Sequence, residues 1–298
     1  MPVEDLPSKV ILTDPLDPNT NLTILKYGAT IISWKNHGQE QLWLSEEARL
    51  DGSKPVRGGI PLVFPIFGKQ KDPKHPTASL PQHGFARSST WEFLGQTMES
   101  PVTVQFGLGP EHLSKEMATA WPFDFTLILT ITLKENSLVT NISVANEGAP
   151  FEFNWLFHTY YRLNDITDTL VNNLVDQTCY DQLLTTSYIE KAPAISFHEE
   201  FDRVYSQINP ARTIQIIDKG KVLFNLHRDG LPDCVVWNPW AKKSAAMADF
   251  MPKSAFHQML CVEPGYVHSM ITLMPGEKWV AEQEIELGGE IKIQANIY

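Results

Sequence analysis

Residues 151–161 read FEFNWLFHTYY, and this stretch decides how we expect the chain to fold. Successive side chains of a β-strand point to opposite faces. One face would carry Phe151, Phe153, Trp155, Phe157, Thr159 and Tyr161, and the other Glu152, Asn154, Leu156, His158 and Tyr160. The first face is apolar enough to be buried, and on the second face His158, beside Asn154 and Tyr160, could line a pocket. The alternative is a core histidine that hydrogen-bonds a neighbour, which is the commoner fate of a lone histidine.

A second strand is predicted at Met259–Glu263, directly before Pro264-Gly265. Met259, Cys261 and Glu263 would share a face, with the carboxylate at the strand end before a tight turn. Such a position would limit the cost of burying a carboxylate. The alternative is a solvated strand end. If the two strands meet, His158 and Glu263 form a pair able to do acid–base chemistry near neutral pH.

The rest of the chain also favours strands over helices. Further strands are predicted at Thr23–Leu25, Thr30–Trp34, Gln41–Leu44, Leu127–Leu133, Leu138–Asn146, Ile214–Ile217, Val222–Leu226, Cys234–Trp237, Ser269–Leu273, Trp279–Leu287 and Ile291–Ile297. Helical patterns are confined to short pieces at Ser114–Ala120 and Asp249–His257. We therefore expect an all-β protein with two large antiparallel sheets packed face to face, forming one domain over residues 1–298.

Composition narrows the function classes. The chain has 298 residues and a formal net charge of −11, which disfavours nucleic acid and anionic membranes as partners. No run approaches the length of a transmembrane helix, and the first residues lack the features of a signal peptide. Three widely spaced cysteines argue against a disulfide framework. We expect a cytoplasmic protein, and nothing in the sequence requires more than a monomer.

A basic segment interrupts this acidic chain. Residues 52–88 carry six Lys or Arg and one Asp, a balance of +5. The segment is rich in proline and glycine, so extended regular structure is not expected there. Arg57-Gly58-Gly59 could offer backbone N–H groups and a guanidinium to an oxyanion, and Gln82-His83-Gly84-Phe85-Ala86-Arg87 adds an amide, an imidazole and a second guanidinium. A phosphate held by Arg57 and Arg87 is the favoured interpretation over exposed arginines in weak ion pairs.

Other residues give weaker signals. Asp202, expected just before a strand, could accept hydrogen bonds from sugar hydroxyls or cap a turn. Trp237-Asn238-Pro239-Trp240 is predicted to be a turn with two indoles, which stack on sugars but more often pack in cores. The remaining histidines and the cysteines show no metal-ligand spacing, so no metal is expected. Dinucleotide, nucleotide and serine-hydrolase motifs are absent from the sequence.

Five segments, taken in order, resemble one family. They are Lys54–Pro61, Gln82–Arg87, Asn154–Tyr160, Val236–Trp240 and Cys261–Gly265. They are similar to the motifs of the hexose-6-phosphate mutarotases (glucose-6-phosphate 1-epimerases), a branch of the aldose 1-epimerase or galactose mutarotase-like superfamily, and the likeness is especially close to fungal members. The resemblance implies a β-supersandwich, no cofactor, and a small-molecule hexose 6-phosphate as substrate.

The resemblance also implies roles for individual residues. His158 resembles the family's general acid and Glu263 its general base. Arg57, Gln82 and Arg87 are similar to its substrate and phosphate ligands, Asp202 to a sugar-hydroxyl ligand, and His83 to a histidine near the ring. The implied reaction opens the sugar ring, rotates the C1–C2 bond and closes the ring on the other face.

Two alternatives stay open at this point. A β-sandwich could bind sugar phosphates without catalysis, because fold alone does not fix function. The same chemistry could also act on unphosphorylated aldoses. The sequence does not choose among glucose, mannose and galactose 6-phosphates.

Overall fold

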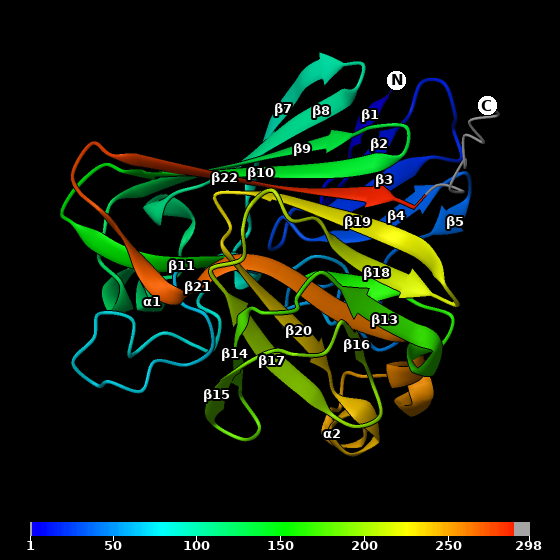
Figure 1. Ribbon diagram of the computed structural model, residues 1–298. Helices are drawn as coiled ribbons and strands as arrows, with labels where there is room; N and C mark the ends of the chain where they lie inside the picture. The colour runs from blue at the N-terminus through cyan, green and yellow to red at the C-terminus, as the bar shows by residue number, and fades with distance from the viewer. Residues whose placement is uncertain (1, 289–298) are drawn as a thin grey trace, which may run out of the picture.

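The computed structural model describes residues 2–288, whose strands form three sheets in which every strand pair is antiparallel (Figure 1). Within this range there are two short α-helices, α1 (Lys115–Ala120) and α2 (Trp240–Ala246). Short 3₁₀ helices lie at Ala86–Ser88, Pro110–His112, Ile166–Asp168 and Lys253–Gln258. The predicted all-β antiparallel class is confirmed, but a third, N-terminal sheet was not expected.

The strands divide among the sheets as follows. The five-stranded sheet has the order β1 (Val3–Asp5), β2 (Lys9–Thr13), β3 (Asn21–Leu25), β4 (Ile31–Asn36), β5 (Gln39–Glu40). The nine-stranded sheet has the order β16 (Ala194–Ser196), β13 (Thr169–Asn172), β18 (Ile214–Asp218), β19 (Lys221–Asp229), β22 (Lys278–Leu287), β10 (Ser137–Asn146), β9 (Phe125–Leu133), β8 (Val102–Leu108), β7 (Glu92–Glu99). The eight-stranded sheet has the order β15 (Thr186–Ile189), β14 (Thr178–Asp181), β17 (Phe201–Ser206), β20 (Asp233–Asn238), β21 (Met259–Leu273), β11 (Phe151–Phe157), β6 (Leu62–Val63), with β12 (Tyr160–Arg162) also paired to β21.

The core lies between the nine-stranded and eight-stranded sheets. Aromatic side chains cross this space: the rings of Tyr161 in β12 and Phe224 in β19 are 4.8 Å apart, and those of Phe153 in β11 and Trp279 in β22 are 5.5 Å apart. Alternating β-branched and aromatic residues form strands because one set of side chains can be buried while the other faces outward. The two sheets thus form the predicted sandwich.

The alternation predicted for residues 151–161 is present, although the strand is interrupted. Phe153, Trp155, Phe157 and Tyr161 lie in the shared core, whereas Tyr160 packs in a separate cluster on the outer face of the sheet. Regular pairing stops after β11 and resumes at β12. The residues in between, His158 and Thr159, therefore lie where the chain leaves the ladder.

The turn predicted at Pro264-Gly265 is wrong, because β21 continues through both residues. Gly265 pairs with Leu156 of β11 and Cys261 with Tyr160 of β12, while the positions between them have no partner in either strand. A proline donates no N–H, so this gap in the ladder is where a strand can accept it. Glycine follows because a Cβ at residue 265 would lie 2.7 Å from the Trp155 carbonyl oxygen.

Other boundaries also differ from expectation. Gln41–Leu44 is not a strand, since only Leu42 and Leu44 form isolated bridges, and Ser269–Leu273 is the end of β21. The expected turn at Trp237–Trp240 instead leads from β20 into α2. The helical piece at Asp249–His257 is only the 3₁₀ helix Lys253–Gln258. The predicted strand Ile291–Ile297 lies outside the described residues.

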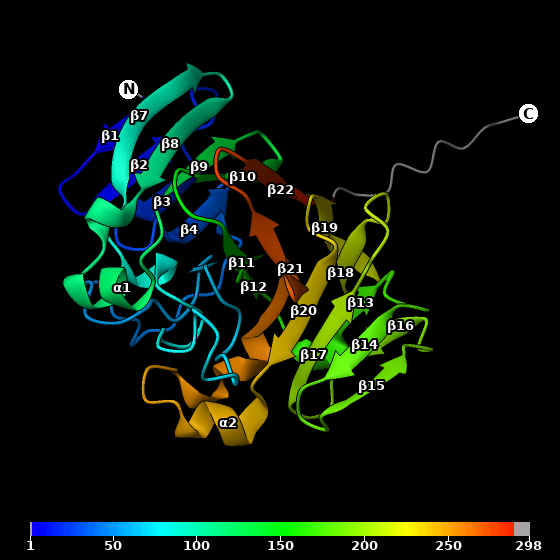
Figure 2. The ribbon, with the colours of Figure 1, turned by 90° about the vertical axis from the view of Figure 1, so that its left-hand side faces the viewer.

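Residues 51–89 are mostly irregular, as predicted, apart from β6 and one 3₁₀ turn. The light-blue loop between β6 and the 3₁₀ helix Ala86–Ser88, together with α2, lies on the side of the eight-stranded sheet that faces away from the nine-stranded sheet (Figures 1 and 2). Within residues 2–288, no helix combines the length and hydrophobicity required to cross a membrane.

Candidate active site

His158 is held rigidly at the interruption between β11 and β12. Its backbone N–H donates to the Pro61 carbonyl at 2.9 Å, and the N–H of Tyr160 donates to Gly59 at 2.9 Å. The imidazole stacks on the Tyr160 ring, with centroids 4.8 Å apart. Its buried Nδ1 makes no hydrogen bond to any other group in the described part of the chain. This arrangement differs from a core histidine that is satisfied by a neighbour.

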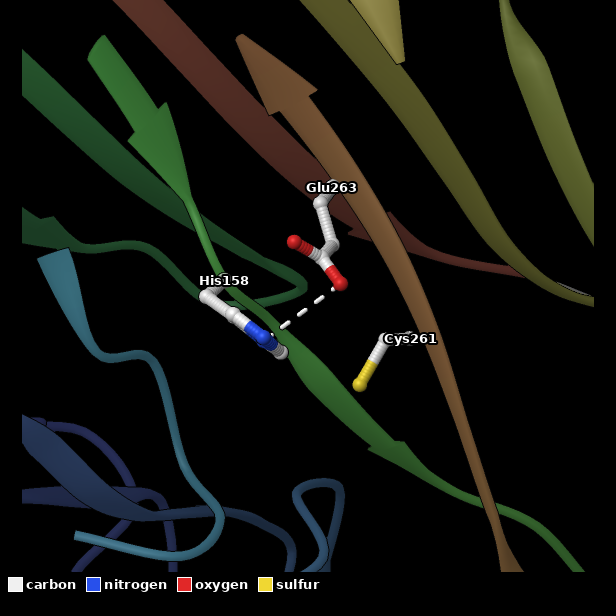
Figure 3. Close-up of side chains that lie close together, drawn as sticks. All are labelled: His158, Cys261 and Glu263. Atoms are coloured by element: carbon white, nitrogen blue, oxygen red, sulfur yellow. Dashed lines mark ion pairs between the residues drawn. The ribbon is translucent and has the colours of Figure 1, made fainter. Parts of the chain in front are cut away.

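Glu263 projects from the middle of β21 toward His158 (Figure 3). Its Oε1 lies 3.4 Å from His158 Nδ1, within ion-pair distance, and the residue is only 1% exposed. Its Oε2 is also buried and makes no hydrogen bond within residues 2–288. The two strands therefore meet as the proposed pair requires. The expected strand-end position for the carboxylate is wrong, because β21 does not stop there.

Burial determines the protonation of this pair. It raises the pKa of Glu263 well above its usual value, with a smaller contribution from the negative charge of Asp202. It lowers the pKa of His158 well below its usual value, helped by His83 and by two nearby arginines. Between the two pKa values the pair holds one proton, which favours a protonated carboxyl and a neutral imidazole.

Arg57 enters the site from the basic segment with its guanidinium already oriented. Nε and one terminal nitrogen lie 3.3 Å from Asp249 Oδ2, and the other terminal nitrogen donates to the Tyr160 hydroxyl at 3.2 Å. Burial alone would lower the pKa of Arg57, but these two partners outweigh it and raise the pKa. Asp249 and Tyr160 were not singled out in the sequence as functional, and only the folded chain brings them to Arg57.

Gly59, the second glycine after Arg57, does not serve as predicted. The Gly59 N–H donates to the Trp43 carbonyl at 2.8 Å, so this group is not free to bind an oxyanion. Gly59 has φ of 66°, and a Cβ there would lie 2.1 Å from the Ile31 carbonyl oxygen. The glycine is needed because two backbones pass close to each other.

The Gln82–Arg87 segment folds back over the same face. His83 and Gly84 both have positive φ, 67° and 68°, and the Arg87 guanidinium donates to the Gln82 carbonyl at 2.8 Å. Burial lowers the pKa of Arg87 to about 10, so it stays charged at neutral pH. Its Nε is buried and makes no hydrogen bond within the described chain. Arg87 thus keeps donor capacity for an anion.

His83 lies beside His158, with ring centroids 5.9 Å apart. Burial, followed by the charges of Arg87 and Arg57, lowers its pKa to about 3. Its Nδ1 accepts a hydrogen bond from the Gly68 N–H at 3.2 Å, which leaves the proton of the neutral ring on Nε2. His83 can therefore act as a neutral hydrogen-bond donor in the site, but not as an acid at neutral pH.

Asp202 lies within β17 rather than before a strand, and its carboxylate does not cap a turn. Its Oδ1 accepts from the Gln182 side chain at 2.6 Å, and Oδ2 lies 4.0 Å from Lys243 Nζ. Burial raises the pKa of Asp202. Gln182, Lys243 of α2 and Trp237 also line the site. Of these three, the sequence drew attention only to Trp237, through its indole.

A cleft of about 320 Å³ unites these groups, a volume typical of small-molecule sites. All seven predicted site residues line it: Arg57, Gln82, His83, Arg87, His158, Asp202 and Glu263. A larger hollow of about 670 Å³ borders Asn36, Arg162 and Gln258. None of the seven lines that hollow, so the predicted site residues gather in the smaller of the two cavities. The smaller cleft can hold a polar ring against an acid–base pair and an anionic group against two arginines.

Comparison with known proteins points to one family. The family model described as aldose 1-epimerase matches residues 15–286. A relative from Cenchrus ciliaris, named "putative glucose-6-phosphate 1-epimerase", is 37% identical over 268 residues, which cover 86% of this chain and 78% of the relative. A relative of the same name from Escherichia coli is 30% identical over 253 residues, which cover 84% of this chain and 81% of the relative.

Solved structures show the same fold. A "putative mutarotase" from Salmonella typhimurium superposes with a TM-score of 0.81 at 23% identity, covering 96% of this chain and 92% of the other. A protein from Synechocystis superposes with a TM-score of 0.79 at 23% identity, covering 96% of this chain and 97% of the other. At these identities the structural likeness concerns the fold.

Proposed function

The chain belongs to the aldose 1-epimerase family, and we propose that it interconverts the α and β anomers of D-glucose 6-phosphate, and of other hexose 6-phosphates, without a cofactor. Family membership makes it an isomerase of the epimerase or mutarotase type. The observation that carries the proposal is the pair of unsatisfied polar atoms, His158 Nδ1 and Glu263 Oε2, in a cleft that also holds two arginines. Unsatisfied buried groups cost roughly 1–3 kcal/mol each, a cost that a bound sugar would offset.

In the proposed reaction Glu263 takes the proton of the anomeric hydroxyl while His158 gives a proton to the ring oxygen. The C1–O5 bond breaks, the aldehyde forms, and rotation about C1–C2 presents the other face. Ring closure returns both protons, so one proton stays with the pair in every state. A positioned acid and base each contribute on the order of 10²–10⁴ in rate.

The proton distribution of the free site matches the open-chain stage of this cycle. Burial favours neutral His158 and protonated Glu263, whereas a closed sugar about to open needs the proton on the imidazole. The charges of Arg87 and Arg57 are among the causes that lower the pKa of His158. A phosphate dianion beside them would offset that effect and raise the pKa of His158, so the substrate would itself favour the reactive proton distribution.

Arg57 and Arg87 favour a phosphorylated sugar as the proposed substrate. Arg57 is oriented by Asp249 and Tyr160, and Arg87 keeps a buried Nε without a partner among residues 2–288. Bidentate, charge-assisted hydrogen bonds suit a phosphate. Asp202 and neutral His83 would bind sugar hydroxyls, the first by accepting and the second by donating hydrogen bonds.

Anomer-exchange NMR on glucose 6-phosphate and on free glucose tests this proposal. We expect exchange of glucose 6-phosphate far above the buffer rate, with a much smaller gain for glucose. Binding without any acceleration would instead indicate a sugar-phosphate-binding module. Equal acceleration of both sugars would indicate a mutarotase of unphosphorylated aldoses.

A further inference from the structure

A third chemically active side chain lies against the acid–base pair. Cys261 precedes Glu263 by two residues on the same face of β21, and its Sγ points to the same place (Figure 3). Sγ, a ring nitrogen of His158 and a carboxylate oxygen of Glu263 all lie within 4.8 Å of one another. The sequence spacing gave no sign of this group, because the histidine comes from a distant strand.

The three side chains offer a sulfur, a nitrogen and an oxygen ligand. This combination suits zinc and cadmium, whereas magnesium and calcium prefer oxygen ligands alone. Zinc binds such atoms at roughly 2.0–2.3 Å in a tetrahedral arrangement, so two ligand atoms of one ion lie about 3.3–3.6 Å apart. His158 Nδ1 and Glu263 Oε1 already lie 3.4 Å apart. Sγ would have to approach them by up to about 1 Å for the three atoms to surround one ion.

Two further observations point to a ligand at this position. His158 Nδ1 and Glu263 Oε2 are buried atoms without a hydrogen-bond partner in the described chain, and their residues are 9% and 1% exposed. Both side chains also line the cleft, from which an ion and a water molecule can reach them. Three protein ligands with a fourth position open to the cleft is the usual arrangement of an accessible zinc site.

We propose that His158, Cys261 and Glu263 bind one thiophilic divalent cation, such as Zn²⁺, which excludes the sugar ring and inactivates the enzyme. Binding itself does not depend on the reaction, whereas the inactivation rests on the proposed function. The nearby arginines repel cations, so hard cations that cannot use the thiolate should not compete.

Direct cadmium binding provides the test, because a cadmium–thiolate bond absorbs in the ultraviolet. Wild-type protein titrated with Cd²⁺ should show this absorption at one ion per chain, with matching stoichiometry by calorimetry. Cys261→Ala should lose the absorption and bind at least roughly 10–100-fold more weakly, since even an outer-shell change costs that much. Cys234→Ala is the matched control, because that buried cysteine lies in the core between the sheets.

Several outcomes would overturn the proposal. One is a wild-type protein without cadmium–thiolate absorption, and another is equal binding by Cys261→Ala or by Cys261→Ser, which keeps the side chain's size. Folding of each variant is checked by circular dichroism. Anomer exchange, with inhibition expressed relative to each variant's own metal-free rate, should show Zn²⁺ inhibition that depends on Cys261. Cysteine-dependent binding in a protein without exchange activity would refute the function and leave the metal site standing.

Discussion

Replacing Arg57 and Arg87 together by alanine should abolish the preference for phosphorylated sugar. Arg57 is held by Asp249 and Tyr160, so its guanidinium reaches the substrate pre-oriented, and Arg87 is anchored on the Gln82 carbonyl. A hydrogen bond to a charged group contributes about 1.5–3 kcal/mol. Since about 1.4 kcal/mol is tenfold, each arginine should contribute roughly 10–150-fold in kcat/KM for glucose 6-phosphate.

Anomer-exchange NMR at several substrate concentrations gives kcat/KM for each variant and sugar. We expect each single variant to lose about 10–150-fold on glucose 6-phosphate and the double variant to lose about 10²–10⁴-fold. Free glucose should be converted at a rate close to that of the wild type, because it lacks the group that the arginines bind. Arg57→Lys should recover only part of the loss, because lysine cannot form the bidentate pair.

Lys74→Ala is the matched control for charge. It removes one positive charge from the same basic segment, but Lys74 is exposed and does not line the cleft. Its kcat/KM for glucose 6-phosphate should stay near the wild-type value. The phosphate assignment would be refuted by equal losses on both sugars in the arginine variants, or by a loss in Lys74→Ala as large as theirs.

The remaining predictions concern the acid–base pair and one glycine. Glu263→Gln and His158→Asn should each lose most anomer exchange, on the order of 10²–10⁴-fold, with unchanged circular dichroism; a fully active Glu263→Gln would remove it as the base. The pH profile of kcat/KM should be bell-shaped, falling where both groups are protonated, below the lowered pKa of His158, and where both are deprotonated, above the raised pKa of Glu263; a flat profile would contradict this. The pKa of Glu263 is raised in the folded state. The stability that Glu263 contributes is therefore present below pH 4.5, its ordinary pKa, and is lost as the pH rises through the pKa of the folded state. Glu263→Gln should accordingly have a higher Tm than the wild type only on the alkaline side. Gly84→Ala places a Cβ 2.1 Å from the Phe64 carbonyl oxygen, so the free energy of unfolding measured by urea titration should fall by at least about 1–3 kcal/mol. Gly68→Ala has open space around its Cβ, so its free energy of unfolding should fall by only about 1 kcal/mol.

Local pattern was enough to predict the strand that leads into His158. The alternation in residues 151–161 indicated which side chains would be buried, and the core contains Phe153, Trp155 and Tyr161 as expected. The interruption at His158 was not predictable from that pattern. It depends on Pro61 and Gly59, which take over the backbone hydrogen bonds from another part of the chain.

The position of Glu263 shows where local signals mislead. Pro-Gly ordinarily marks a turn, yet β21 continues because the gap in its ladder accepts Pro264. Pairing between strands that are distant in the sequence creates that gap, so the sequence of one segment alone does not predict it. For the same reason Asp249 was missed, because it lies far along the chain from Arg57, which it contacts. Lys243 follows Trp240 closely in the sequence, but its approach to Asp202 depends on the pairing of distant strands. Two strands of the N-terminal sheet were predicted, at Thr23–Leu25 and Thr30–Trp34, and they correspond to β3 and β4. That they form a separate sheet was not predicted, because which strands pair with one another is not recorded in any single segment.

In the proposed mechanism His158 and Glu263 exchange protons with a hexose ring that opens at C1–O5. Anomer exchange of glucose 6-phosphate with an isotopic label in its anomeric oxygen tests this directly, with wild-type enzyme and with Glu263→Gln. We predict rapid exchange between anomers in the wild type with the label retained over the first turnovers, and almost no exchange in the variant. Loss of the label to water at the rate of exchange, or equal exchange in the variant, would contradict the account.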